Sequence, residues 1–539
     1  MARAYQVASD ADLGPLLQAP PAGTNPEVVR QLRYMYEAGG WVLLESALAD
    51  LPADLRWLFE SGAVTIEQLA ALHRALGATS ASDLVAAVRR EAVRHVPGLD
   101  PAVEAAVAVA LKGLRAAIPR IPLGRALALV DPFLARLRAH PGVMWAEPAG
   151  SLRRGQDSVG DIEIVAPASD PSQAFDAVLD LPDLARCLHR SPRRLYVLTD
   201  RVQVGVRSPQ PDTAGAVFLH LTGSRAHVDG LDALAAERGW TLEPEGLARG
   251  TGSTRVAETE EEIYAALGLP WIPPEIRNGD DEIAAARHGE LPSLISRLDI
   301  RGDLHMHTNF SDGRDTVDAM VEACVSLGYS YLAITDHSPH SSASRNLSID
   351  SIKRQAEEIA VLRQKHANIT ILHGCEVDIL PAGQLDFADH VLERLDVVLA
   401  SLHEGGGQPP EQLMRRYLAA MRHPLVSIIT HPTNRLIPYR RGYDLDYDRL
   451  FAAAVDTGTV IEIDGAPAHL DLDGALARRA AATGATLIIS SDSHRAEMLE
   501  RQMQLGILTA RRGWVEPRHV LNTRPIGAVR AAIAAKRSQ

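Results

Sequence analysis

The sequence predicts a multidomain protein with an all-α region, then an α+β region and finally a C-terminal α/β barrel. At 539 residues, the chain is too long for one ordinary domain. Helical periodicity in its first part gives way after about residue 121 to a mixture of strand and helix patterns. After about residue 299, strand and helix patterns alternate up to the C-terminus, which is typical of folds built on a parallel sheet.

Residues 24–120 are predicted to be all-α. They contain periodic stretches rich in Ala, Leu and Arg, separated by turn dipeptides such as Pro97-Gly98. Residues 121–264 are predicted to be α+β, because the segments 161–165 and 194–206 alternate apolar and polar side chains with the period of a strand.

Residues 265–298 are predicted to link the α+β region to the barrel at 299–539. The linker is expected to be stiffened by Pro270, Pro273 and Pro274, which are followed by an acidic run at 280–282.

The barrel is predicted from seven short apolar runs, each of which ends on or near polar residues. They span residues 303–307, 331–337, 369–376, 397–403, 426–431, 459–464 and 486–494. In six of the seven, those polar residues are candidate metal ligands. Parallel strands bring their carboxyl ends to one rim of an α/β barrel, so we expect these side chains to form one site.

Nine side chains are the candidate ligands: His305, His307, Asp312, His337, Glu376, His403, His431, Asp492 and His494. Neutral imidazole suits zinc, manganese or iron, and carboxylates can bridge two ions. Nine ligands exceed the needs of one ion, so two or three divalent metal ions are predicted. The alternative for any single histidine is a hydrogen-bonded core role, and His373 is left open between core packing and support of a ligand.

Composition limits the classes of function. The net charge of −13 provides no bulk attraction to nucleic acid, so any DNA affinity must come from local basic patches. The three cysteines are too far apart for a disulfide framework or a zinc ribbon, which favours a reducing cytoplasm. No apolar run is long enough to cross a membrane, and the N-terminus lacks the pattern of a signal peptide.

The C-terminal motifs resemble the PHP (polymerase and histidinol phosphatase) domain family. They include Asp303-Leu-His-Met-His307, Thr335-Asp-His-Ser338, Gly374-Cys-Glu-Val-Asp378, Ser401-Leu-His403, Thr430-His-Pro432 and Ser491-Asp-Ser-His494. The resemblance implies a distorted (β/α)7 barrel, a ligand set filled at all nine positions, and phosphoester hydrolysis with manganese or zinc. Arg345, Arg435 and His469 follow strand ends and could bind phosphate, although ordinary surface charge explains them equally well.

The preceding motifs resemble bacterial family X DNA polymerases (PolX) with a C-terminal PHP domain. Gly150-Ser-Leu-Arg-Arg-Gly155 and Gly160-Asp-Ile-Glu163 are similar to the polymerase palm. The resemblance implies that Gly150, Ser151 and Arg154 hold a nucleotide triphosphate, and that Asp161 and Glu163 hold Mg²⁺. It also implies a helix-hairpin-helix DNA-binding region at 24–120 and a polymerase-beta-like palm and thumb at 121–264.

Several residues depart from the PolX pattern. The hairpin that carries the third palm carboxylate has Gln203 in the corresponding stretch, and Asp200 is expected to be only a turn residue. Val228 and Asp232 replace residues that should face triphosphate or template, and Asp100 replaces a glycine of the second helix-hairpin-helix. No lysine precedes Lys112, which argues against a Schiff-base lyase.

We therefore expect a DNA repair protein whose PHP domain is a 3′–5′ exonuclease, with polymerase activity weak or lost. Its expected partner is DNA with ends, gaps or single-stranded 3′ termini. No association with a membrane is expected. The alternatives are an active DNA polymerase with a PHP exonuclease, a small-molecule phosphatase of the histidinol phosphatase type, and a DNA-end scaffold. Metal identity, cleavage polarity and oligomeric state stay open.

Overall fold

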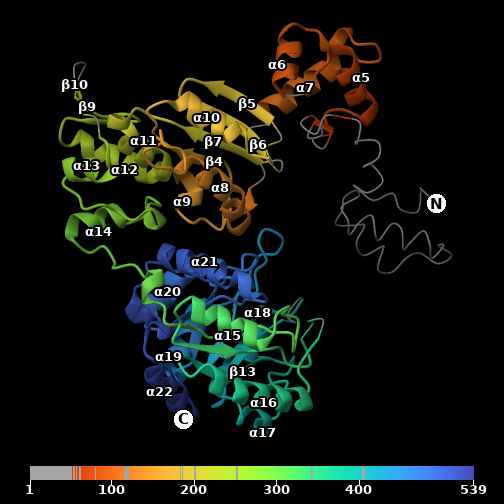
Figure 1. Ribbon diagram of the computed structural model, residues 1–539, viewed down its shortest axis with the longest axis vertical. Coiled ribbons are helices and arrows are strands. Elements are labelled where there is room, and N and C mark those ends of the chain that lie inside the picture. Colours follow the sequence, from red (N-terminus) through yellow and green to blue (C-terminus); the bar gives the residue numbers. More distant parts are fainter. Residues whose placement is uncertain are drawn as a thin grey trace, which may run out of the picture. The chain divides into compact units, whose positions relative to one another are not determined.

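The computed structural model consists of two compact units, residues 1–119 and 120–539 (Figure 1). It describes residues 51–538 except 52–54, 56–57, 60–61, 79–80, 114–119, 183, 185, 200–201, 250–252, 256, 342, 344 and 404–406. Expectations for residues 24–50 and for Asp200 lie outside the described residues.

The described part of the first unit is helical, as the periodicity predicts. Its α-helices are α5 (Ile66–Leu76), α6 (Ala81–Arg89) and α7 (Pro101–Gly113). Thr65 and Gln68 form a capping box at the start of α5, and Gly77 ends that helix in the left-handed conformation with φ 62°. Leu69, Leu72 and Val107 are buried in the core of the unit.

The second unit begins with a five-stranded mixed sheet in the order β2-β4-β7-β6-β5. Its strands are β2 (Glu147–Pro148), β4 (Ile162–Val165), β5 (Arg186–Ser191), β6 (Arg194–Thr199) and β7 (Val202–Arg207). The short strands β1 (Ile121–Pro122) and β3 (Ser158–Val159) pair beside it. The helices of this region are α8 (Leu123–Arg138), α9 (Gly150–Arg153) and α10 (Pro171–Leu179). Apolar residues of α8, α10 and the strands share one buried cluster.

Next come α11 (Ala214–Thr222), α12 (Arg225–Ala236), the antiparallel strands β8 (Thr241–Glu243), β9 (Gly246–Arg249) and β10 (Ser253–Arg255), and α13 (Glu260–Ala266). The expected linker at 265–298 is folded onto these elements and includes α14 (Glu282–His288). Leu267, Ile272 and Ile276 are buried in their shared core. The prolines thus shape a packed segment, because apolar residues between them find a core to enter.

One side chain explains why that segment folds back. Arg277 has no exposed surface and donates two hydrogen bonds, of 2.6 and 2.9 Å, to the carboxylate of Glu260. Burial raises the pKa of Glu260, but Arg277 and Arg153 outweigh it and lower that pKa to about 2. A buried arginine needs such a partner, so residues around 277 cannot leave this surface without a large cost.

The C-terminal part is a barrel of seven parallel strands in consecutive order. They are β11 (Gly302–Asp303), β12 (Tyr331–Ile334), β13 (Thr370–Asp378), β14 (Val397–Ser401), β15 (Ile428–Ile429), β16 (Val460–Asp464) and β17 (Leu487–Ser490). A parallel bridge between Met306 and Ser493 joins the first strand's end to the last strand's end. The predicted seven-stranded barrel is confirmed.

Helices surround the strands: α15 (Val317–Ser326), α16 (Ile349–Lys365), α17 (Asp389–Leu392), α18 (Pro410–Arg422), α19 (Tyr447–Thr457), α20 (Gly474–Thr483), α21 (Leu499–Arg512) and α22 (Ile526–Arg537). Each strand is buried on both faces, which explains its continuous apolar run. Leu332 and Ile334 pack towards the helices, whereas Tyr331 and Ala333 lie in a second cluster with Val529 and Ile533 of α22.

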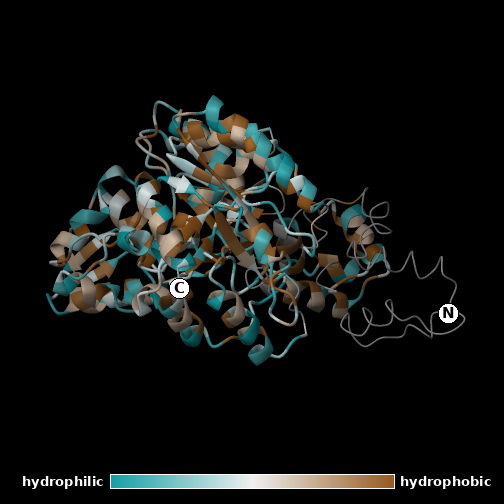
Figure 2. Cartoon of the chain, turned by 90° about the horizontal axis from the view of Figure 1, so that it is seen from below, coloured by the Kyte–Doolittle hydropathy of each residue, from teal (hydrophilic) through white to brown (hydrophobic). Residues whose placement is uncertain are grey.

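That second cluster closes the amino end of the barrel. It contains first residues of strands, such as Val397 and Val460, covered by α22. Figure 2 shows the apolar colouring concentrated on strands, with mixed colouring on the helices around them. Because α22 covers the amino end, solvent and ligands reach the barrel from its carboxyl end. Across the described residues, no helix has both the length and the apolar character to span a membrane.

Candidate metal centre

All nine candidate ligands meet at the carboxyl end of the barrel, around the carboxylate of Glu376. That side chain has no exposed surface and faces five imidazoles. The shortest distances from its oxygens are to His337 Nδ1 (2.8 Å), His431 Nε2 (2.9 Å), His403 Nε2 (3.3 Å), His305 Nε2 (3.5 Å) and His307 Nε2 (3.6 Å). Glu376 is therefore placed to bridge cations held by different histidines.

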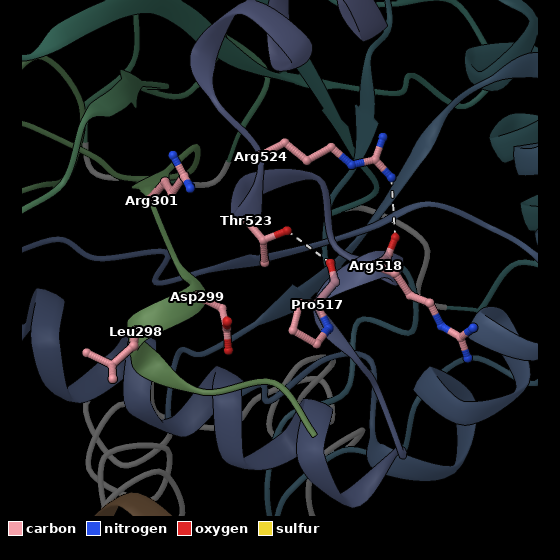
Figure 3. A pocket seen from close by; sticks show the side chains of 7 residues that line it. All are labelled: Leu298, Asp299, Arg301, Pro517, Arg518, Thr523 and Arg524. Atoms are coloured by element: carbon pink, nitrogen blue, oxygen red, sulfur yellow. Dashed lines mark hydrogen bonds between the residues drawn. The ribbon is translucent and has the colours of Figure 1, made fainter. Parts of the chain in front are cut away.

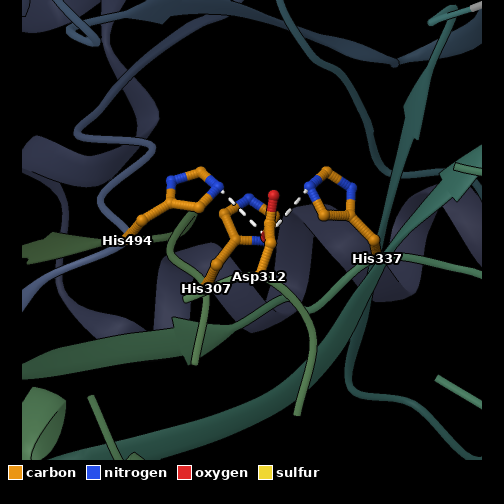
Figure 4. Close-up of side chains that lie close together, drawn as sticks. All are labelled: His307, Asp312, His337 and His494. Atoms are coloured by element: carbon orange, nitrogen blue, oxygen red, sulfur yellow. Dashed lines mark ion pairs between the residues drawn. The ribbon is translucent and has the colours of Figure 1, made fainter. Parts of the chain in front are cut away.

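A second group lies around Asp312 (Figure 4). Its Oδ1 is 3.2 Å from His494 Nε2 and 3.5 Å from His337 Nε2. The ring of His307 stacks between His337 and His494, with centroid distances of 4.2 and 4.4 Å. These four residues offer ligand atoms that all lie within 4.8 Å of one another.

A third group consists of His305, His307 and Asp492. The Nε2 atoms of His305 and His307 face each other at 3.1 Å, and Asp492 Oδ1 is 3.0 Å from His307 Nε2. Two neutral imidazole nitrogens cannot both accept, so a proton or a metal ion must separate their lone pairs.

The outer nitrogens of three ligands are fixed by acceptors. His305 Nδ1 donates to Glu462 at 2.7 Å, His403 Nδ1 donates to Asp378 at 3.0 Å, and His494 Nδ1 donates to the carbonyl of Asp492 at 3.0 Å. Each bond orients its ring so that, in the neutral imidazole, the Nε2 lone pair is directed toward the centre. The arrangement is the one that metal ligation requires.

Glu462 and Asp378 were absent from the sequence-based candidates. Glu462 accepts from His305, from the backbone N–H of His431 at 2.9 Å and from the Thr430 hydroxyl. It lies in the middle of the one apolar run without a predicted ligand. An acidic residue inside an apolar run was the sequence signal that could have identified Glu462.

Asp336 organises the loop that carries Asp312. Its carboxylate accepts from the backbone N–H and hydroxyl of Thr308 at 2.8 and 2.6 Å, and from the backbone N–H of Ser311 at 3.1 Å. Gln355 Nε2 donates to it at 2.7 Å, and Gln355 Oε1 in turn accepts from His373 Nε2 at 3.0 Å. His373 therefore supports the loop that holds a candidate ligand from a distance.

Electrostatics favour charged carboxylates and a neutral His307. Burial raises the pKa of Glu376, but His337 and His403 outweigh it and hold that pKa well below its ordinary value. Burial, together with the neighbouring His337 and His494, lowers the pKa of His307 to about 4. Anionic oxygens and an uncharged nitrogen are the donor forms that cations bind.

Some buried atoms of the candidate ligands lack a hydrogen-bond partner, which fits a role in binding metal ions. His307 Nδ1 and His431 Nδ1 are buried without a hydrogen-bond partner. His431 and Asp492 have positive φ angles of 29° and 51°, which side chains other than glycine rarely adopt. Such strain, of order 1–3 kcal/mol per residue, persists where the surrounding structure imposes it, commonly at functional sites.

Known proteins match both halves of the chain. Residues 303–454 match the PHP domain family, and residues 217–278 match the DNA polymerase beta thumb family. A DNA polymerase/3′-5′ exonuclease PolX of Bacillus subtilis is 34% identical over 492 residues, covering 90% of this chain and 86% of the relative. The chain belongs to the PolX family.

Other relatives match about a third of the chain. A probable phosphatase of Syntrophotalea carbinolica is 30% identical over 32% of this chain and 68% of its own length. A probable phosphatase of Thermoanaerobacter sp. is 29% identical over 36% of this chain and 78% of its own length. PHP domains bind several metal ions, and the histidine and aspartate groups described above are this PolX protein's candidate sites.

The palm of this PolX protein lacks an acid next to Glu163. Strands β4 and β7 pair with Ile162 opposite Val204 and Glu163 opposite Gly205, so the same register places Gln203 beside Asp161. Gln203 and Gly205 therefore share the face of Asp161 and Glu163, and neither supplies a carboxylate. Gln203 stays the predicted position of the lost carboxylate.

Glu163 has a cationic partner from the protein itself. Arg207 Nε donates to Glu163 at 2.9 Å, and Arg207 Nη2 donates to the Tyr196 hydroxyl at 3.1 Å. Asp161, two residues before Glu163, is exposed. The acidic pair expected to bind Mg²⁺ is thus split into one solvated acid and one ion-paired acid.

The residues expected at the triphosphate lie between palm and thumb. Gly150 has φ 64° and opens α9, Ser151 follows in its first turn, and Arg154 Nη1 donates to the carbonyl of Thr222 at 2.6 Å. Burial and then Arg120 lower the pKa of Arg154 to about 10, so it stays charged at neutral pH. Asp232 accepts from Leu242 N at 2.8 Å, so it caps a strand of the thumb.

Two of the three expected phosphate contacts have protein partners. Arg435 donates to Asp157 at 2.7 Å, to the His469 carbonyl at 2.8 Å and to the Leu470 carbonyl. His469 stacks on His431 with 5.6 Å between ring centroids, and its Nδ1 donates to the Arg435 carbonyl at 2.8 Å. The guanidinium of Arg435 is thus engaged within the protein. Arg345 is exposed.

A separate surface pocket of about 460 Å³ lies elsewhere on the barrel (Figure 3). Its lining includes Arg301, Arg518 and Arg524. Arg301 immediately precedes β11, so the pocket is near the amino end of the first strand. It includes none of the nine candidate ligands and is distinct from the metal centre.

Proposed function

We propose that the PHP domain of this protein hydrolyses phosphodiesters of DNA as a 3′–5′ exonuclease. The nine candidate ligands would hold two or three divalent ions, either manganese or zinc. The observation that carries this proposal is the buried Glu376 carboxylate facing five imidazoles, beside buried nitrogens without hydrogen-bond partners. The exonuclease named for the Bacillus subtilis relative agrees with it.

Bound metal ions would supply an activated water and neutralise charge on the phosphate. The protein's own side chains orient the candidate ligands. Glu462 and Asp378 keep the Nε2 lone pairs of His305 and His403 directed inward. Asp336 fixes the loop of Asp312 through Thr308. The covered amino end of the barrel restricts substrate approach to the carboxyl end, where the ligands lie.

The palm would contribute little or no nucleotide addition. Neither Gln203 nor Gly205 provides a carboxylate beside Asp161 and Glu163, and the guanidinium of Arg207 pairs with Glu163. A Mg²⁺ ion would have to displace that arginine with one fewer anionic ligand than a three-carboxylate site offers. We propose the helical region, palm and thumb as a platform that receives DNA ends, gaps or single-stranded 3′ termini, in a reducing cytoplasm.

A second candidate function is small-molecule phosphatase activity. The probable phosphatases described above support it, since each matches only about a third of this chain. The thumb match and the long PolX relative favour DNA.

A labelled primer–template incubated with the whole protein and Mn²⁺, with and without nucleotides, tests the proposal. We expect the primer to shorten from its 3′ end and not to extend. p-Nitrophenyl phosphate, a monoester, serves as the matched substrate for the phosphatase alternative. Monoester hydrolysis with an intact primer would overturn the exonuclease, and robust extension would overturn the inactive palm.

A further inference from the structure

The palm contacts the barrel at the loop that adjoins the candidate metal centre. This loop, residues 465–473, follows β16 and carries His469, whose ring stacks on His431. Leu470 of the same loop is buried in the apolar core of the palm. A Cβ on Gly124 of the palm would lie 2.6 Å from Pro467 Cβ, so that approach requires glycine. The loop is therefore enclosed between the palm and the metal ligands.

Asp157 of the palm holds this loop through charge. Its carboxylate accepts from Arg435 and from Arg512, and all three side chains are largely buried. Arg435 is four residues after His431, and its Nε and Nη2 donate to the carbonyls of His469 and Leu470. One guanidinium thus ties the palm, the 465–473 loop and the His431 loop together.

A second link joins the two loops inside the barrel. Asp471 is buried and accepts from the backbone N–H of Thr433 at 3.0 Å and from its hydroxyl at 2.8 Å. His431 and Leu470 both have positive φ angles, so each loop is held in a backbone conformation that it would not adopt alone. Loops under such constraint shift when a tether is removed.

We propose that Asp157 of the palm is a positioning residue for the phosphoesterase: through Arg435 it holds His469 and the 465–473 loop against His431. This inference rests on the proposed function of the barrel. It also gives the palm a task that needs neither nucleotide nor catalytic metal there, which is to keep the rim of the nuclease centre in its working geometry.

The contact between Asp131 and Arg501 offers a matched control. It also joins a palm carboxylate to an arginine of the barrel, on α8 and α21, but it involves neither the 465–473 loop nor the His431 loop. Asp157→Ala and Asp131→Ala each delete one such carboxylate. Asp157→Glu retains the charge and serves as the conservative variant.

The kinetic test uses the full chain with Mn²⁺ and bis(p-nitrophenyl) phosphate, a diester too small to need the DNA platform. Displacing groups at a reaction centre by about 1 Å costs up to roughly 100-fold in rate, so we expect Asp157→Ala to lower kcat by about 10- to 100-fold. The KM should stay within about twofold, the metal content should be unchanged, and Asp157→Glu should recover much of the rate. Asp131→Ala should behave as the wild type.

Hydrogen–deuterium exchange of the metal-free proteins provides a reading independent of activity. Peptides covering 465–473 should exchange faster in Asp157→Ala than in the wild type and Asp131→Ala. Wild-type kcat together with unchanged exchange in Asp157→Ala overturns the inference, as does an equal loss in both alanine variants. If Asp157→Ala fails to fold, Arg435→Lys, which keeps a charge but cannot reach both carbonyls, takes its place with the same criteria. A wild-type protein that neither hydrolyses this diester nor shortens the labelled primer refutes the proposed function, while exchange still tests the tether.

Discussion

Glu163 lies directly opposite Gly205 across the parallel strands β4 and β7, and a Cβ at position 205 would be only 2.8 Å from Glu163 Oε2. A side chain at position 205 would therefore clash with Glu163 unless the glutamate moved. Gln203 is two residues earlier on β7, and the same register places it beside Asp161 on the face of the acidic pair. The register thus leaves position 203 for a third carboxylate.

Gln203→Asp should raise metal-dependent nucleotide addition, because it places a third carboxylate on the face of Asp161 and Glu163. The gain should be partial and clearest at high nucleotide concentration, because Arg207 still pairs with Glu163. Primer extension with Mg²⁺ measures it. Gln203→Asn is the control of equal size without charge. Equal extension by the Asn and Asp variants would show that the carboxylate is not what the palm lacks.

Asp492→Asn and His337→Ala should each lower exonuclease activity by about 100-fold or more, because each removes a candidate metal ligand. The fold should persist, as judged by circular dichroism. His390→Ala, on an exposed face of the short helix α17, is the matched control and should cleave like the wild type. Undiminished cleavage by either ligand variant would remove the nine-ligand centre from the reaction.

Glu462→Gln should weaken metal binding by roughly 10- to 100-fold. Its side chain can still accept a hydrogen bond, but it loses the charge that supports His305 Nδ1 and the backbone of His431. Activity measured against Mn²⁺ concentration should therefore shift to higher metal and recover at saturation. A fall in activity that saturating Mn²⁺ leaves unchanged would mean that Glu462 acts in some other way than through the ligands.

Lowering the pH from 7 to 5 should destabilise the metal-free protein partly through His373. Burial lowers the pKa of His373 to about 4, below its unfolded value near 6.5, so the unfolded chain binds more protons in that window. Its contribution is thus present above pH 6.5 and is lost as the pH falls toward 4. His373→Gln should show a smaller fall in melting temperature over this range. A fall equal to that of the wild type would assign the pH dependence to other groups.

The barrel and its candidate ligands could be predicted from the sequence, because the candidate ligands lie at or just after the ends of the apolar runs that form the strands. His305 and His307 follow one strand, and Asp492 and His494 follow another, so the period of a strand and the common rim of a barrel place them together. The palm strands could be predicted because apolar and polar side chains alternate along them. The packing of residues 265–298 could not be predicted, because proline content is a local signal and the partner of Arg277 is seventeen residues away at Glu260.

What the sequence by itself determined is therefore the local chemistry: which strands exist, which residues end them, and that imidazoles and carboxylates gather at one rim. The tertiary structure decided which side chains face one another. It paired Glu163 with Arg207 and Arg435 with Asp157. Register and ion pairing between distant segments depend on how strands and domains pack, and residue spacing along the chain carries no direct record of that packing.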